Sequence, residues 1–167
     1  KIMGQIVGID LGTTNSVVGV IEAGRPIVIA NSEGSRTTPS IVGFTKDKEI
    51  VIGEQARRQL VLNPKNTFYN LKRFIGSDWD ELDDNSISVP YNVKANNAGS
   101  VRVLSPNTQR EYAPEELVSS LIRKLINDAE TYLGDTVDSA VITVPAYFNE
   151  SQSCLLYTSD AADERLS

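Results

Sequence analysis

The feature that most constrains the fold of this chain is a long amphipathic segment, Pro114–Leu133. Its apolar side chains recur at three- and four-residue spacing, which places them on one face of a helix. These residues are Val118, Leu121, Ile122, Leu125, Ile126, Ala129 and Leu133. Proline suits the first helical position, Glu115 and Glu116 suit the positive end of the helix dipole, and Gly134 suits a left-handed terminating residue. Because a helix with one apolar face must bury it, we expect this segment to pack against a sheet.

Short runs of β-branched residues, separated by turn signals, predict that sheet. They span residues 5–10, 16–21, 26–30, 40–44 and 49–52. The loops between the first three runs are short enough for hairpins, which predicts an antiparallel meander. A later run, residues 137–144, is mostly apolar, as in a fully buried strand, and Pro145 closes it. Together these elements predict an α/β fold of the ribonuclease-H-like type, a mixed sheet with packed helices.

The middle of the chain is predicted to be less regular. A helix is expected over residues 55–62, ended by Asn63-Pro64 because a residue before proline is disfavoured in the α region. A second short helical piece is expected after Asn70. Residues 77–85 predict a solvated acidic loop around Trp79, and residues 89–112 predict short strands and turns.

Composition excludes several classes of function. The chain has 16 Lys and Arg against 22 Asp and Glu, a formal charge of −6, which is the wrong sign for a broad nucleic-acid-binding surface. It has no histidine and a single cysteine, Cys154, which excludes His-containing zinc sites, Cys–His nucleophiles and histidine general bases. No apolar run approaches the roughly 18 residues of a membrane span, and the start lacks the apolar core of a secretory signal. We therefore expect a soluble intracellular protein with no nucleic-acid or membrane partner.

The segment with the clearest chemistry is the turn after the first predicted strand, Ile9-Asp10-Leu11-Gly12-Thr13-Thr14-Asn15-Ser16. An aspartate closes the strand, and a glycine two residues later permits close approach of the backbone to a ligand. Such a turn can direct successive N–H groups at a phosphate, while the adjacent carboxylate can hold magnesium through water. On spacing alone, an ordinary hairpin turn in which Asp10 caps its own loop is the better interpretation. The segment lacks the Gly-Lys-Ser/Thr ending of a Walker loop.

The octapeptide of residues 9–16 resembles the signature of the seventy-kilodalton heat-shock chaperone family, of the bacterial DnaK type, and three later stretches extend the resemblance. These are Asn31-Ser32-Glu33-Gly34-Ser35-Arg36-Thr37-Thr38-Pro39-Ser40, then Asn63-Pro64-Lys65-Asn66-Thr67 with Lys72-Arg73-Phe74-Ile75-Gly76, and then Ala140-Val141-Ile142-Thr143-Val144-Pro145-Ala146-Tyr147-Phe148-Asn149. Four matches in the family's order, between residues 6 and 152, make chance an implausible explanation. The third stretch looks closest to cyanobacterial or plastid members.

The resemblance implies the first lobe only of an actin-like ATPase domain, which binds ATP or ADP with magnesium. In the family, the position of Asp10 coordinates magnesium through waters. The turn formed by Gly12, Thr13, Thr14 and Asn15 is implied to cradle the β- and γ-phosphates.

The same resemblance implies two catalytic residues and one relay. Lys72 is implied to reach the γ-phosphate and the attacking water, and the hydroxyl of Thr13 to face the γ-phosphate. Phosphoryl transfer needs mainly positioning and charge neutralisation, which a lysine ammonium supplies as a point charge. Pro145 is implied to be an allosteric relay between nucleotide state and a peptide-binding domain. Read from the residues alone, Lys72 is a solvated surface lysine, Thr13 a turn residue and Pro145 a strand terminator.

The resemblance stops after Gln152. We expect residues 1–153 to be an incomplete N-terminal lobe of the nucleotide-binding domain, and residues 154–167 to be a non-native tail translated from a sequencing adapter. The family's catalytic glutamate, second phosphate loop, adenosine-binding lobe and peptide-binding domain have no counterpart in these residues. We therefore expect an ATP-driven chaperone as the parent protein, and little or no ATPase activity from this chain alone. The parent's implied partners are unfolded client peptides, a J-domain co-chaperone and a nucleotide-exchange factor, in the cytoplasm or a plastid stroma.

Two alternatives remain at this point. A sugar or acetate kinase of the actin-like superfamily shares an Asp-x-Gly-Thr-Thr/Ser phosphate loop, although the second stretch, residues 31–40, argues against it. A non-catalytic interaction module could use the sheet without nucleotide, but the presence of Asp10, Thr13 and Lys72 together disfavours it.

Overall fold

The computed structural model describes residues 5–143 of the 167-residue chain. Its central element is a five-stranded sheet in the order β11-β1-β2-β3, with β4 also paired to β2. The bounds are β1 Gln5–Asp10, β2 Asn15–Glu22, β3 Arg25–Val28, β4 Thr38–Pro39 and β11 Val137–Thr143. β1 pairs with β11 in parallel and with β2 antiparallel, which makes the sheet mixed. The predicted α/β fold with a mixed sheet is confirmed.

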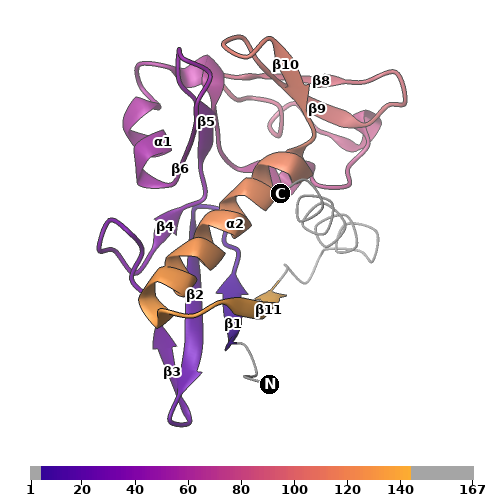
Figure 1. Cartoon of the computed structure of the whole chain (residues 1–167). Helices are drawn as coiled ribbons and strands as arrows, with labels where there is room; N and C mark the ends of the chain where they lie inside the picture. Colours follow the sequence, from indigo (N-terminus) through magenta and orange to yellow (C-terminus); the bar gives the residue numbers. More distant parts are fainter. Residues whose placement is uncertain (1–4, 144–167) are drawn as a thin grey trace.

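The long helix α2, Pro114–Leu133, has the predicted bounds and crosses one face of this sheet (Figure 1). Gly134 adopts a left-handed conformation with φ 65° and ends it, as glycine can at little cost. The Glu116 carboxylate accepts a hydrogen bond from the N–H of Ala113 at 2.9 Å, which satisfies one donor at the start of the helix. The predicted apolar face is confirmed, since Val118, Leu121 and the other members of the set are buried or packed against the core.

Two smaller sheets and several short helices form the other end of the molecule (Figure 1). Their strand orders are β6-β5-β7 and β10-β9-β8. The strand bounds are β5 Val42–Phe44, β6 Ile50–Ile52, β7 Thr67–Phe68, β8 Asn92–Ala95, β9 Val101–Ser105 and β10 Arg110–Tyr112. The helices are α1 Glu54–Gln59 and the 3₁₀ segments η1 Pro64–Asn66, η2 Leu71–Phe74 and η3 Trp79–Glu81.

An aromatic cluster joins the two small sheets. The rings of Phe44 on β5 and Tyr112 on β10 stack with centroids 4.7 Å apart, and Phe68 on β7 meets Tyr91 edge-on at 5.1 Å. Offset and edge-to-face pairs of this kind add to the stabilisation from burial. The cluster links β5 to β10 and β7 to the segment just before β8.

Three sequence-based predictions need correction. The helix predicted over residues 55–62 ends at Gln59, because the chain then tightens into turns in which Leu62 and Asn63 donate to the Gln59 carbonyl. Of the run predicted over residues 40–44, only Val42–Phe44 forms a strand, β5, while Ser40 and Ile41 link it to the preceding β4. The strand predicted as fully buried, β11, lies at the edge of the sheet that the described residues form. Its Val141 is 64% exposed, because within these residues α2 covers only one face of the sheet.

Candidate functional site

The turn between β1 and β2 is closed so tightly that only glycine fits at position 12. A Cβ atom there would lie 2.0 Å from the backbone oxygen of Asn15, far inside van der Waals contact. Thr13, Thr14 and Asn15 follow on the exposed side of the turn. The structure therefore presents the four residues that the family resemblance implies in phosphate binding as one compact, accessible turn.

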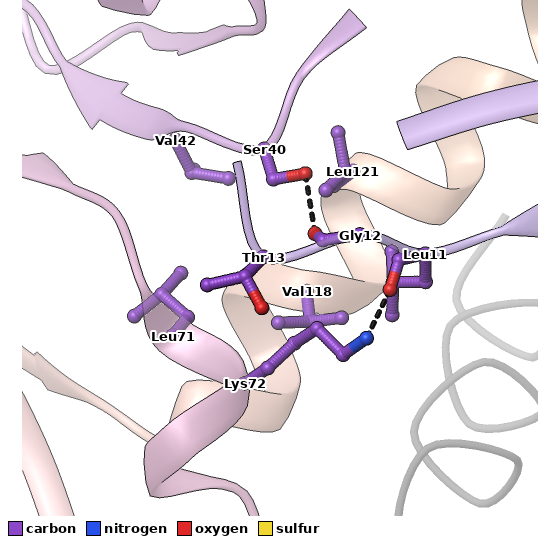
Figure 2. A pocket seen from close by; sticks show the side chains of 9 residues that line it. All are labelled: Leu11, Gly12, Thr13, Ser40, Val42, Leu71, Lys72, Val118 and Leu121. Atoms are coloured by element: carbon purple, nitrogen blue, oxygen red, sulfur yellow. Dashed lines mark hydrogen bonds between the residues drawn. The ribbon is translucent and has the colours of Figure 1, made fainter. Parts of the chain in front are cut away.

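Ser40, which follows β4, supports this turn from behind. Its Oγ donates a hydrogen bond to the Gly12 carbonyl at 2.7 Å (Figure 2). Its backbone N–H donates to the Thr14 carbonyl at 2.9 Å. The buried Ser16 places its Oγ 2.8 Å from that of Ser40. Ser40 lies in one of the family-like stretches, but the sequence does not indicate its contact with Gly12, because the two residues are 28 positions apart.

The loop that leads to Ser40 is itself anchored on α2. The Ser32 N–H donates to the Asp128 carboxylate at 3.3 Å, and Lys124 Nζ contacts Asp128 at 2.9 Å and Glu33 at 3.3 Å. Asp128 is buried, so its charge is compensated within this cluster. The Asn31 side chain accepts from the N–H groups of Glu33 and Ser35 and thereby shapes the loop. The polar side of the long helix thus positions a segment of the site, which its apolar periodicity did not indicate.

Lys72 reaches the base of the turn from η2. It is buried, and its Nζ donates a hydrogen bond to the carbonyl of Leu11 (Figure 2). Burial lowers the pKa of this lysine, while the charge of Asp10 acts in the opposite direction. Lys72 and Thr13 line one small pocket (Figure 2). The solvated-lysine interpretation is therefore wrong for Lys72, since its side chain is turned inward to the site.

Asp10 ends β1 on the opposite face of the sheet from the side chains of Val7 and Ile9, which are buried beneath α2. The carboxylate is exposed and accepts a hydrogen bond from the Thr143 hydroxyl of the neighbouring strand at 2.8 Å. Asp10 does not cap its own loop through a side-chain hydrogen bond among the described contacts. It is free to present oxygen ligands beside the turn.

Pro145, the predicted relay, and the predicted tail of residues 154–167 lie outside the described residues. Within residues 5–143, no group of three or more His, Cys, Asp or Glu side chains could hold a metal ion among themselves. No helix of this part of the chain is long and apolar enough to cross a membrane.

Comparison with known proteins gives a consistent result. The Hsp70 protein family matches residues 6–163. The chain is 89% identical over 150 residues to the chaperone protein dnaK1 of Prochlorococcus marinus subsp. pastoris, which covers 90% of this chain and 23% of that protein. It is 61% identical to the chaperone protein dnaK3 of Thermosynechococcus vestitus and 57% identical to the chaperone protein DnaK of Trichormus variabilis, each over 90% of this chain and 22% of the relative.

The chain thus spans less than a quarter of the length of these relatives. The family match continues past Gln152, the point at which the resemblance was expected to stop, whereas these relatives match over 150 residues. The origin of residues 154–167 stays a prediction. A match to the family over most of the chain, together with these identities, shows that the chain belongs to the Hsp70 family and carries part of the first lobe of its actin-like ATPase domain.

Proposed function

We propose that the full-length protein carrying this lobe is an ATP-dependent molecular chaperone of the DnaK type. It converts ATP and water to ADP and phosphate, and the cycle drives binding and release of client peptides. The observation that carries the proposal is the convergence of Lys72, Thr13 and Asp10 at one end of β1, although Lys72 is about 60 residues away in sequence. Family membership implies nucleotide binding, and relatives named as DnaK chaperones support the activity.

In this proposal the turn of Gly12, Thr13, Thr14 and Asn15 binds the β- and γ-phosphates. Gly12 permits a tight turn whose next three residues, Thr13, Thr14 and Asn15, are exposed, and a concave arrangement of backbone N–H groups attracts anions. The absence of a side chain at Gly12 permits this closure. The turn therefore binds and orients the phosphates before any chemistry occurs.

Lys72 supplies positive charge where the transferred phosphoryl group accumulates negative charge. Its burial keeps water away from the ammonium, which strengthens its interaction with a phosphate. The Leu11 carbonyl holds the ammonium at the edge of the turn. Thr13, in the same pocket, offers a hydroxyl toward the γ-phosphate.

Magnesium is part of the proposal, and the donors fit it. Asp10 provides an exposed carboxylate, and Mg²⁺ is commonly held by one or two carboxylates, substrate phosphates and several waters. When bound, the ion neutralises charge on the phosphate oxygens. The Thr143 hydroxyl fixes the orientation of the carboxylate by donating to one of its oxygens. Among the described residues, we assign magnesium coordination through water to Asp10 alone.

Partners and regulation extend the same proposal to the whole protein. Clients, a J-domain co-chaperone and a nucleotide-exchange factor would act through parts beyond this lobe, and Pro145 would relay nucleotide state to the peptide-binding domain. The cytoplasm is the proposed compartment, with a plastid stroma as the alternative for a plastid protein. The family match favours this function over a sugar or acetate kinase.

We expect this chain alone to have little or no ATPase activity, because one lobe cannot enclose the nucleotide from both sides. Isothermal titration calorimetry of the chain with Mg-ATP checks this expectation. Binding with a sub-millimolar Kd would contradict it.

The function is tested in the full-length protein with Lys72→Met. We expect hydrolysis to fall by about 10²- to 10³-fold, since a charge that stabilises the transition state is lost, while the Kd for Mg-ADP changes little. Lys46→Met is the control, because Lys46 is an exposed lysine in the turn between β5 and β6. Unchanged hydrolysis in the Lys72 variant would overturn the assigned role, and absence of Mg-ATP binding by the unsubstituted protein would overturn the function.

A further inference from the structure

We propose that Ser40 is the positioning residue of the phosphate turn and that Ser16 fixes the direction of its hydroxyl. The inference rests on the proposed function and adds to it a residue that acts through the turn. It starts from the two hydrogen bonds that Ser40 donates to the turn, to the carbonyls of Gly12 and Thr14.

These two contacts orient the turn's N–H groups through the geometry of the peptide bond. Each peptide bond among the described residues is trans, so the C=O of one residue and the N–H of the next point in opposite directions. When the Gly12 and Thr14 carbonyls point toward Ser40, the N–H groups of Thr13 and Asn15 point away from it. Ser40 therefore sets the direction of two donors that the turn can offer to a phosphate.

The direction of the Ser40 hydroxyl follows from a proton count. A serine hydroxyl has one proton to donate and can accept from other donors. Ser40 Oγ contacts both the Gly12 carbonyl at 2.7 Å and Ser16 Oγ at 2.8 Å. Since a carbonyl can only accept, the Ser40 proton goes to Gly12, and the Ser16 proton goes to Ser40. The result is a directed chain, from Ser16 to Ser40 to the turn.

Burial makes the loss of either hydrogen bond in this series energetically costly. Ser16 is fully buried and Ser40 is 8% exposed, so water cannot readily replace a lost partner. An unpaired buried hydrogen-bonding group carries its full desolvation penalty. Without the Ser40 hydroxyl, the Gly12 peptide is released, and its rotation would turn the Thr13 N–H out of the binding direction.

The test uses the full-length protein with Ser40→Ala, and it compares ligands with and without phosphates. We expect the Kd for Mg-ADP to rise by about five- to tenfold, the effect of one hydrogen bond, while the Kd for adenosine stays within about twofold. Ser40→Thr keeps the hydroxyl, and we expect it to restore Mg-ADP binding. A general structural defect would weaken the binding of both ligands equally. A loss confined to Mg-ADP therefore distinguishes a positioning role from a role in stability.

Two further variants complete the experiment. Ser105→Ala is the matched control, because Ser105 is another fully buried serine, with its Oγ 2.9 Å from Asn66 Oδ1. We expect it to lower the stability of the protein without weakening Mg-ADP binding relative to adenosine binding. Ser16→Ala removes only the first hydroxyl of the hydrogen-bond chain. It replaces Ser40→Ala as the test if that variant fails to fold, and we expect a smaller rise in the Kd for Mg-ADP.

The outcomes are distinct. Equal losses for Mg-ADP and adenosine, or unchanged Mg-ADP binding in both serine variants, would overturn the role of Ser40. Failure of the unsubstituted protein to bind Mg-ADP would instead overturn the proposed function.

Discussion

The two faces of the five-stranded sheet carry apolar side chains of the same kind, but α2 covers only one of them. Beneath α2, Val7, Ile9 and Val20 are nearly inaccessible. On the opposite face, Ile6 is 59% exposed and Ile21 is 65% exposed. Strand alternation therefore supplies two apolar faces, and only the tertiary arrangement determines which of them becomes core within the described residues.

The two charged groups of the site differ in exposure in the same way as the two faces. Lys72 is buried against the covered side, while Asp10 is exposed on the open side. The two groups are close enough for the charge of Asp10 to raise the pKa of Lys72 against the larger effect of burial. A site built at the end of such a sheet can hold an ammonium out of water and leave a carboxylate available to a hydrated ion.

The largest effect is expected from truncating the covered face. Ile122 on α2 is fully buried, and Ile122→Ala should lower the free energy of unfolding by about 2–5 kcal/mol, because it leaves a cavity. Ile21→Thr on the open face is the control and should cost less than about 0.5 kcal/mol. Urea unfolding followed by the fluorescence of Trp79, the single tryptophan, measures both. Similar losses of unfolding free energy in the two variants would contradict the conclusion that only one face of the sheet is buried.

A second prediction asks whether the rest of the full-length protein covers the open face. Val141→Thr retains a β-branched shape, so it should change the stability of this chain by less than about 0.5 kcal/mol. In the full-length protein the hydroxyl would be buried, and we expect a loss of about 1–3 kcal/mol. Thermal and urea unfolding of both proteins make the comparison. An equal effect in both would mean that the face stays open.

Two glycines opposite each other on β1 and β2 give a finer test of space on the open face. A Cβ added at Gly8 meets nothing within 4 Å, so Gly8→Ala should stabilise this chain by about 0.4–1 kcal/mol. A Cβ added at Gly19 would lie 2.9 Å from the Ile27 carbonyl oxygen, so Gly19→Ala should be destabilising. Urea midpoints of the two variants are compared with that of the parent chain. The same sign for both would contradict the assigned packing.

The smallest effect is expected from pH, acting through Lys72. Its pKa in the folded chain lies below the ordinary value of 10.5, chiefly because of burial. Between the two values the unfolded chain binds more protons, so the contribution of Lys72 to stability rises as the pH rises through that window. The stability of the parent chain minus that of Lys72→Met should therefore increase from neutral pH toward the ordinary lysine value. Urea unfolding at several pH values checks this, and a constant or falling difference would contradict it.

Much of the local structure follows from the sequence alone. The helix Pro114–Leu133 and the strand Gln5–Asp10 have the predicted bounds, since proline, glycine and hydrophobic periodicity mark them locally. The α1 helix ends earlier than expected because Gln59 is engaged by later residues, which a local signal does not contain. The exposure of β11 was missed for a related reason, since an apolar run does not reveal what covers it.

The sequence by itself determined the order of the main elements, the glycine-containing turn after the first strand, the exclusion of histidine chemistry and the family. Tertiary structure alone decided that Lys72 is buried against that turn, that Ser40 and Ser16 support it from behind, and that one face of the sheet is core and the other exposed. The physical reason is the sequence separation over which each kind of interaction acts. Turn, cap and periodicity signals act within a few residues, whereas burial and hydrogen bonding across 24 to 61 positions exist only after the chain has packed.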